Sequence, residues 1–148
     1  MIITKDLIQL RLDAQDWQGA LTALAERLLA RGYVRQGFLD SLLTREAVYP
    51  TGLRTAVPVA LCHTDAQFVS QSALAVGVLQ QPVAFREMGS PEDEVMVEIV
   101  FLLAIDDSDE QVPTLQRFAL LLKDRAALEI IRDASDAASL AEYLKGWL

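Results

Sequence analysis

A long apolar segment, VMVEIVFLLAI at 95–105, most constrains what this chain can fold into. Its first half is dominated by β-branched residues, which are enriched in strands because they pack well on a pleated surface. Its most apolar part, IVFLLAI at 99–105, is too short to cross a bilayer as a helix. We therefore expect 95–105 to be the central, buried strand of a sheet.

Other segments have strand or turn patterns. Apolar and polar residues alternate over 6–12, which predicts a half-buried strand. The stretches 55–62 and 72–79 are predicted to be extended as well, and Pro58 indicates that 55–62 lies at an edge or an irregularity of the sheet. GSPEDE at 89–94 is rich in turn-forming and charged residues and is predicted to be a loop.

Helical periodicity marks the remaining segments. Asp16 can cap a helix that ends near Gly32, and a second helix is predicted from 36 to 47. After the central strand comes a further helix, and the C-terminal part divides at 133–135 into two short helices, with Ser135 as a cap for the second. The apolar residues expected to face inward on the first, second and third of these helices are Trp17, Ala20, Leu21, Leu24 and Leu28, then Phe38, Leu39, Leu42 and Leu43, then Leu115, Phe118, Ala119 and Leu122.

This mixture of strands and helices predicts an α/β fold in which a mixed β-sheet is sandwiched by helices on both faces. The chain has 148 residues and a hydrophobic content of 52%, enough to build a core. No repeat, low-complexity segment or long linker divides it, so we expect a single domain covering 1–148.

Charge and composition narrow the range of functions. The formal net charge is −8 and no basic stripe is present, which argues against nucleic acid and anionic membranes as partners. The N-terminal stretch MIITKDLIQLRLD has no signal-peptide core, so we expect a cytoplasmic protein that does not insert into a membrane. One cysteine and one histidine cannot form a disulfide or a Cys-rich zinc site, and no glycine motif for a nucleotide occurs, so no metal and no cofactor are expected.

The one histidine, His63, directly follows the one cysteine, at the point where an apolar run becomes polar. Its pKa lies near 6.5 in the absence of perturbation, so neutral imidazole is abundant at pH 7 and can act as a base or nucleophile. A lone histidine is more often structural or merely exposed, but its place at the end of an apolar run, where scaffolds present reactive groups, favours a functional role. Cys62 is not expected to pair with it, because neighbours in a strand point to opposite faces; a small buried side chain is the expected role of Cys62.

The segment LLTREAVYPTGL (42–53), followed by an apolar run and a histidine, resembles the enzyme IIA proteins of the bacterial phosphotransferase system, of the mannitol/fructose class. Arg45, Glu46, Thr51, Gly52 and His63 stand in the places of that family's pattern. The resemblance extends in the family order over three further segments: ALAVGVLQQPVAF (73–85), VEIVFLLAIDDSDEQVPTLQRFALLL (97–122) and LKDRAALEIIRDASDAASLAEYL (122–144).

The resemblance implies a phosphocarrier, a component of a sugar permease with transferase activity. A histidine-containing phosphocarrier protein would phosphorylate His63, which would pass the phosphoryl group to an enzyme IIB. Arg45 would stabilise the phosphate through its planar guanidinium, although a cation at a helix end is also favoured by the helix dipole alone. Thr64, Asp65 or a backbone carbonyl could hold the second ring nitrogen. A regulatory module of the same fold, acting by binding a partner protein, is the alternative.

Two positions depart from the family pattern. The family usually has Pro-His-Gly at the reactive site, whereas this chain has Cys62-His63-Thr64. Many members carry a second histidine after the central strand, where this chain has Gln111, as in the galactitol-type branch, which it resembles best. Gln111 could hydrogen-bond the phosphate or the imidazole, or it could complete a capping box with Ser108.

A docking partner requires an apolar surface next to the reactive histidine. Leu53, Phe68 and Val69 flank the site in sequence and are the candidates for that surface, with ordinary core packing as their alternative role.

Overall fold

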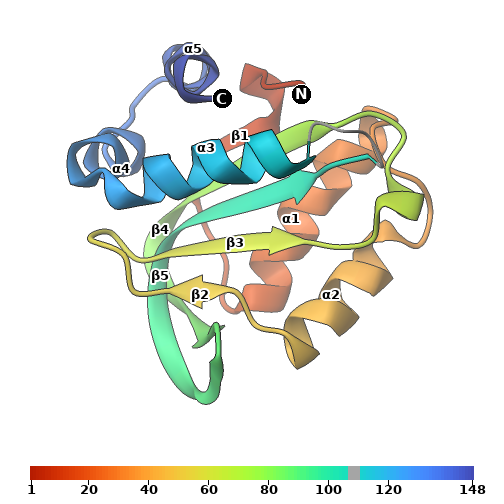
Figure 1. Cartoon of the computed structure of the whole chain (residues 1–148), viewed down its shortest axis with the longest axis horizontal. Helices are drawn as coiled ribbons and strands as arrows, with labels where there is room; N and C mark the ends of the chain where they lie inside the picture. Colours follow the sequence, from red (N-terminus) through yellow and green to blue (C-terminus); the bar gives the residue numbers. More distant parts are fainter. Residues whose placement is uncertain (107–110) are drawn as a thin grey trace.

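The computed structural model describes residues 1–106 and 111–148, with the backbone alone at Gln111. A sheet runs through the middle of the molecule and has helices on both faces (Figure 1), which confirms the predicted α/β sandwich. The strands are β1 (Ile8–Leu12), β2 (Gly52–Leu53), β3 (Val59–His63), β4 (Ala73–Glu87) and β5 (Ser90–Ala104).

The predicted central strand is confirmed in β5, which pairs with β4 on one side and with β3 on the other. Strands β4 and β5 form an antiparallel hairpin, whereas β3 runs parallel to β5 and places His63 beside Leu103. Toward the edges of the sheet, β1 pairs in parallel with β4, and the short β2 pairs antiparallel with β3. The apolar half of β5, Ile99 to Ala104, is buried, because helices cover both faces of the sheet there.

The prediction of a loop over 89–94 is wrong. Residues 90–94 begin β5, and Arg86 pairs with Glu94 across the hairpin. The turn is made at Gly89, whose φ of 80° suits glycine. Strand β4 also continues past residue 79 to Glu87, through a shift of register between Val78 and Val83. The end of the hairpin is largely exposed, so its strands carry polar residues without the alternation that marks a half-buried strand.

The helices divide between the two faces of the sheet (Figure 1). One apolar core lies between the sheet and the first two helices, and the other lies between the sheet and the last three. The described helices are α1 (Trp17–Ala30), α2 (Phe38–Val48), α3 (Gln111–Lys123), α4 (Arg125–Arg132) and α5 (Ala137–Trp147), with short 3₁₀ turns at Lys5–Leu7 and Ala66–Phe68.

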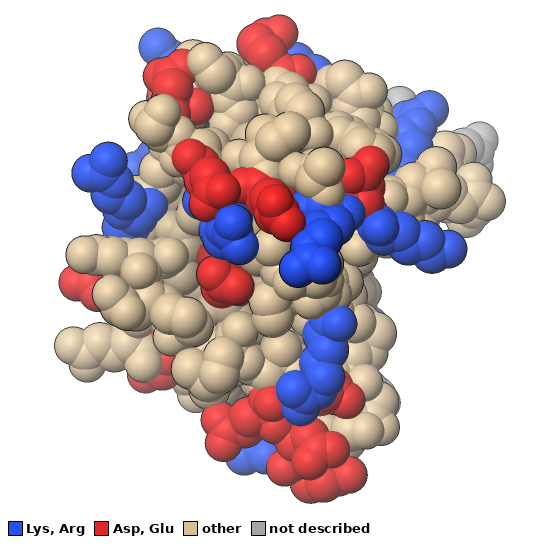
Figure 2. All heavy atoms as spheres, turned by 90° about the vertical axis from the view of Figure 1, so that its left-hand side faces the viewer, with Lys and Arg blue, Asp and Glu red and all other residues tan. Residues whose placement is uncertain are grey.

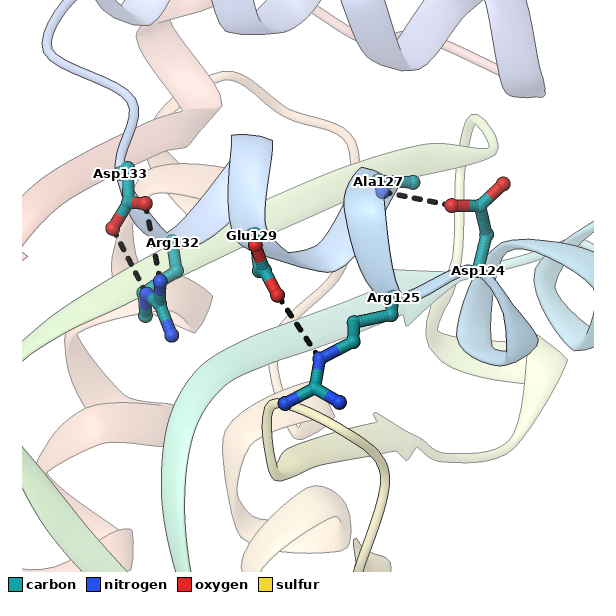
Figure 3. A network of polar contacts seen from close by, with 6 residues as sticks. All are labelled: Asp124, Arg125, Ala127, Glu129, Arg132 and Asp133. Atoms are coloured by element: carbon teal, nitrogen blue, oxygen red, sulfur yellow. Dashed lines mark hydrogen bonds and ion pairs between the residues drawn. The ribbon is translucent and has the colours of Figure 1, made fainter.

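Side-chain caps begin three of these helices. Asp16 accepts a hydrogen bond from the amide of Gly19, as predicted. Asp136, and not Ser135, caps α5 by accepting from the amide of Ser139 at 2.9 Å. Figure 3 shows the same contact at α4, where Asp124 accepts from Ala127, together with the ion pairs that follow along that helix. An aspartate accepts more strongly than a serine, and its charge also favours the helix N-terminus.

The inward face of α3 differs from the predicted one. Phe118 is buried as expected, but Leu115 is 46% exposed and Ala119 is also exposed. Thr114 and Leu121 are buried in their place. A leucine of this helix is therefore left at the surface, at a position that matters for the site described below.

Charges of both signs are interspersed on the face shown in Figure 2. Acidic side chains gather at its lower end, where the β4–β5 hairpin lies, and Glu92, Asp93 and Glu94 are exposed there. No described helix combines the length and the hydrophobicity needed to cross a membrane.

Candidate functional site

His63 is the last residue of β3 and opens onto a cavity of about 270 Å³. Arg45, from the last turn of α2, lines the same cavity, so the fold brings together two of the residues that the sequence singled out. Leu103 and Ile105 at the end of β5 and Leu115 on α3 supply apolar walls. The cavity therefore combines an imidazole, a guanidinium and an apolar rim.

The surroundings of His63 favour its neutral form. Burial lowers the pKa of the imidazole, and the positive charge of Arg45 lowers it further. The backbone carbonyl of Leu61 acts in the opposite direction, although Nδ1 itself is buried and has no hydrogen-bond partner among the described residues. At pH 7 the ring is thus uncharged, which is the state a nitrogen nucleophile needs.

Arg45 has few competing partners. Its Nε is buried and makes no hydrogen bond within residues 1–106 and 111–148. Its guanidinium carbon lies 5.6 Å from the centre of the Tyr49 ring, a cation–π contact made one helical turn along α2. An arginine held by an aromatic ring keeps its N–H groups available for an anion.

A second, larger cavity of about 550 Å³ adjoins the first, between α2 and the segment that follows His63. Arg45, Thr64 and Asp65 line both cavities, and Asp40 adds a second carboxylate to the larger one. Among the described residues that line either cavity, Arg45 is the only lysine or arginine. A single cation therefore dominates the surroundings of the imidazole.

The turn between α2 and β2 is held by a buried carboxylate. Glu46 accepts hydrogen bonds from the backbone N–H and the hydroxyl of Thr51, both at 2.7 Å. The Thr51 hydroxyl also lies 3.2 Å from Sγ of Cys62. Burial raises the pKa of Glu46, against the opposing effect of the two Thr51 hydrogen bonds. Cys62 is fully buried, as predicted, but it is also part of a polar contact that the sequence did not indicate.

Hydrogen bonds also hold the segment after His63. The hydroxyls of Thr64 and Ser41 share a short hydrogen bond, which ties this segment to α2. Arg35 donates through Nη1 to the carbonyls of Gln67 and Val69, at 2.9 and 2.8 Å. Sequence reasoning missed Ser41 and Arg35, because these contacts join positions far apart in the chain. It missed Tyr49 as well, although its spacing of four residues from Arg45 on a helix was a usable signal.

Not every predicted site residue lies where we expected. Of the two roles that the sequence allowed for Val69, the structure shows core packing, since its side chain is only 4% exposed. Leu53 and Phe68 are half-buried against the two cores. Gln111 is the first residue of α3, and its side chain lies outside the described part of the structure, as do Ser108 and Glu110. The exposed apolar side chains near the site are instead Leu115, Val48 and Tyr49.

The part of the chain that the structure describes contains no group of three or more His, Cys, Asp or Glu residues able to hold a metal ion. Neither Thr64 nor Asp65 makes a hydrogen bond to His63 Nδ1, and the Leu61 carbonyl acts on the ring only by raising its pKa.

Comparison with known proteins gives a family for this arrangement. Residues 1–147 match the model of the family described as "Phosphoenolpyruvate-dependent sugar phosphotransferase system, EIIA 2". The chain is 30% identical over 118 residues to the transcriptional regulator ManR of Bacillus subtilis, a match that covers 80% of this chain and 17% of ManR. It is 26% identical over 102 residues to the galactitol-specific EIIA component of Escherichia coli, covering 68% and 67% of the two chains. The chain thus spans about a sixth of the length of ManR.

Solved structures have the same fold. The crystal structure of IIA mannitol from Escherichia coli superimposes with a TM-score of 0.74 at 18% identity, over 100% of both chains. Enzyme IIA in the complex of enzyme IIA and phosphorylated enzyme IIB for mannitol, also from Escherichia coli, gives a TM-score of 0.78 at 21% identity, over 95% of both chains. The chain therefore belongs to the EIIA 2 family of the phosphoenolpyruvate-dependent sugar phosphotransferase system.

Proposed function

We propose that His63 carries the phosphoryl group, accepting it from the phosphohistidine of a histidine-containing phosphocarrier protein and passing it to an enzyme IIB. The observation that carries this proposal is a neutral imidazole that shares a cavity with one arginine. In the first step a ring nitrogen lone pair attacks phosphorus, the donor's N–P bond breaks, and the donor's imidazole leaves. In the second step a nucleophile on enzyme IIB attacks phosphorus and His63 leaves.

Nε2 is the nitrogen that reacts in this proposal. Nδ1 is buried and so cannot reach a protein partner. The Leu61 carbonyl favours a proton on the ring, and a proton on Nδ1 leaves the lone pair on Nε2. The attack therefore needs no prior loss of a proton.

Arg45 stabilises the transferred group. Phosphoryl transfer passes through a loose transition state whose negative charge is spread over three oxygens, and a guanidinium can contact two of them. The position of Arg45 on the same cavity as His63 supports this role. Gln111 is proposed as a further hydrogen-bond donor to the phosphoryl group. It lies four residues before Leu115 on α3, hence on the same side of the helix as a residue that lines the cavity.

The proposed partners are those expected of this family. An enzyme IIB as acceptor is supported by the mannitol enzyme IIA that has been solved with its phosphorylated enzyme IIB and shares this fold. The histidine-containing phosphocarrier protein is the donor expected for a phosphoenolpyruvate-dependent system. We propose that residues 1–148 form one such domain and work in the cytoplasm, where both partners would meet it.

A regulatory role is the second candidate, and the match to ManR supports it. That protein is a transcriptional regulator of which this chain covers only 17%, so a domain of this kind also occurs in a regulator. In that role phosphorylation of His63 would change the affinity for a partner protein, and no transfer to a sugar would follow.

Phosphorylation in a reconstituted mixture of phosphoenolpyruvate, enzyme I and the phosphocarrier protein tests the proposal. One acid-labile, base-stable phosphoryl group is expected on His63, none on a His63→Ala variant, and an unchanged stoichiometry on Cys62→Ala. Label on His63→Ala would overturn the assignment. Label on His63 that no enzyme IIB removes would favour the regulatory role.

A further inference from the structure

Arg45 and His63, the two proposed reactive residues, are each adjacent in sequence to a residue of one buried chain of hydrogen bonds. Glu46 follows Arg45 on α2, and Cys62 precedes His63 on β3. Thr51 lies between them, with its hydroxyl 2.7 Å from Glu46 Oε1 and 3.2 Å from Cys62 Sγ. The chain thus joins the end of α2 to the end of β3, and Arg45 and His63, the sequence neighbours of its two outer residues, line one cavity.

We propose that Glu46, Thr51 and Cys62 act as a positioning chain that fixes the guanidinium of Arg45 relative to the imidazole of His63. This inference rests on the proposed function for its effect on phosphoryl transfer, but the geometry that it concerns exists in the unphosphorylated protein.

The chain has a consistent direction of hydrogen bonding. Thr51 has a single hydroxyl proton, which it can donate to Glu46 or to Cys62 but not to both. With Glu46 ionised, the Thr51 hydroxyl donates to Oε1, and the Cys62 thiol donates to the hydroxyl oxygen. Burial raises the pKa of Cys62 well above its ordinary value, so the thiol keeps the proton that this arrangement needs. Every polar group of the chain then has a partner.

Burial makes the chain stiff. All three residues are at most 4% exposed, and a buried polar group that loses its partner costs more free energy than the hydrogen bond itself contributes. Breaking the Thr51 contacts would leave a buried carboxylate with fewer donors. The end of α2 is therefore held to the turn at Thr51, and through that turn to β3.

Close packing against β4 also restricts the turn that contains Thr51. Thr51 precedes Gly52, where a Cβ would lie 2.7 Å from the carbonyl oxygen of Arg86 on β4. The backbone at Gly52 is thus in close contact with β4, while the side chain of Thr51 is hydrogen-bonded to Glu46. A spacing set from both sides can be maintained while partners dock and leave.

The position of the chain also accounts for one departure from the family pattern. A proline in place of Cys62 would have no thiol to donate to Thr51. In this protein the side chain before the reactive histidine hydrogen-bonds to the turn, so the hydrogen-bonded chain supplies the rigidity that a proline ring supplies through its fixed φ.

The titration of His63, followed by NMR, is sensitive to the distance between the Arg45 guanidinium and the imidazole. Arg45 and Asp65 are the charged residues that line its cavity among those described, and the Arg45 charge lowers the pKa of the imidazole. Arg45→Gln should therefore raise the titration midpoint of His63. Thr51→Val, which removes the hydroxyl and changes neither charge nor shape, should raise it by a measurable part of that shift.

Two controls separate positioning from stability. Thr55→Val removes a different threonine hydrogen bond, the one to the Val57 carbonyl at 2.6 Å, and should leave the midpoint unchanged. In the double variant Arg45→Gln/Thr51→Val, the midpoint should equal that of Arg45→Gln alone, because the hydroxyl acts through the arginine. Cys62→Ala gives a second, milder test if Thr51→Val does not fold.

The outcomes are distinct. A raised midpoint in Thr51→Val, together with slower phosphoryl transfer, supports the positioning chain. A lower melting temperature with an unchanged midpoint overturns it and leaves the chain a merely structural feature. If the wild-type protein is not phosphorylated at all, while the midpoint still rises in Thr51→Val, the proposed function fails and the positioning chain stands.

Discussion

Arg45 lies in the last turn of α2 and His63 at the end of β3, yet the two side chains line one cavity. The positive charge of Arg45 lowers the pKa of the His63 imidazole. In an enzyme that needed a cationic histidine, this pairing would be unfavourable. A nitrogen nucleophile that must stay neutral and then carry a phosphate has the opposite need. A protonated His63 would be repelled by Arg45, whereas a neutral His63 is not. Once His63 carries a phosphoryl group, the negative phosphate is attracted to the Arg45 guanidinium.

Arg45→Ala should slow phosphorylation of His63 by roughly 10- to 150-fold, because one charge-assisted contact of about 1.5–3 kcal/mol is lost. Arg45→Lys should restore only part of the rate, since an ammonium cannot contact two oxygens in a plane. Rapid-quench reactions with the phosphorylated carrier protein measure the rate of phosphoryl transfer to His63. Arg125→Ala is the matched control, because the Arg125 side chain on α4 is 76% exposed and does not line the His63 cavity. Wild-type rates in Arg45→Ala would remove the arginine from the mechanism.

The stability of the protein should fall as the pH falls below about 6.5, the pKa of an unperturbed histidine. His63 has a lowered pKa in the folded state, so between its folded and unfolded values the unfolded chain binds a proton that the folded protein does not. Its contribution is complete above the unfolded value and is lost toward the folded one. Urea unfolding of wild type and His63→Gln across pH 4.5–8 measures this, and two parallel curves would contradict it.

Gly52→Ala should lower the free energy of unfolding by about 1–3 kcal/mol, because its Cβ would lie 2.7 Å from the Arg86 carbonyl oxygen and 3.3 Å from Phe85 Cβ. Gly146→Ala in α5 is the control, since nothing lies within 4 Å of its Cβ and a helical alanine should stabilise by about 0.5–1 kcal/mol. Chemical denaturation measures both. A neutral Gly52→Ala would mean that the β2–β4 contact adjusts freely.

Leu115→Ser should raise the KM for a partner protein by about tenfold, which corresponds to about 1.4 kcal/mol of lost apolar contact, while changing kcat little. Leu115 is 46% exposed and lines the His63 cavity. Leu120→Ser on the same helix is the control, because Leu120 is 62% exposed and does not line that cavity. Equal effects of the two substitutions would show that the rim of the cavity is not the docking surface.

Local physics explains which parts of the fold the sequence predicts. The period of apolar residues on α1 and α2 and the β-branched run in β5 are strong local signals, because the same residues that form these elements also bury them. The tip of the β4–β5 hairpin carries no such signal. Its residues 90–94 are mostly exposed, so backbone pairing with β4 decides their conformation and their side chains do not.

The sequence by itself determined the order of the reactive pattern, from Arg45 and Glu46 through Thr51 and Gly52 to His63, and with it the family. Only the tertiary structure decided what these residues do to one another. The pKa of His63 depends on burial and on a charge from another element, and the Glu46–Thr51–Cys62 chain depends on distances between side chains 5 and 11 residues apart. Leu115 reaches the site only because α3 packs beside the end of β5. Such through-space terms fall off over a few ångströms, and no spacing in the sequence encodes them.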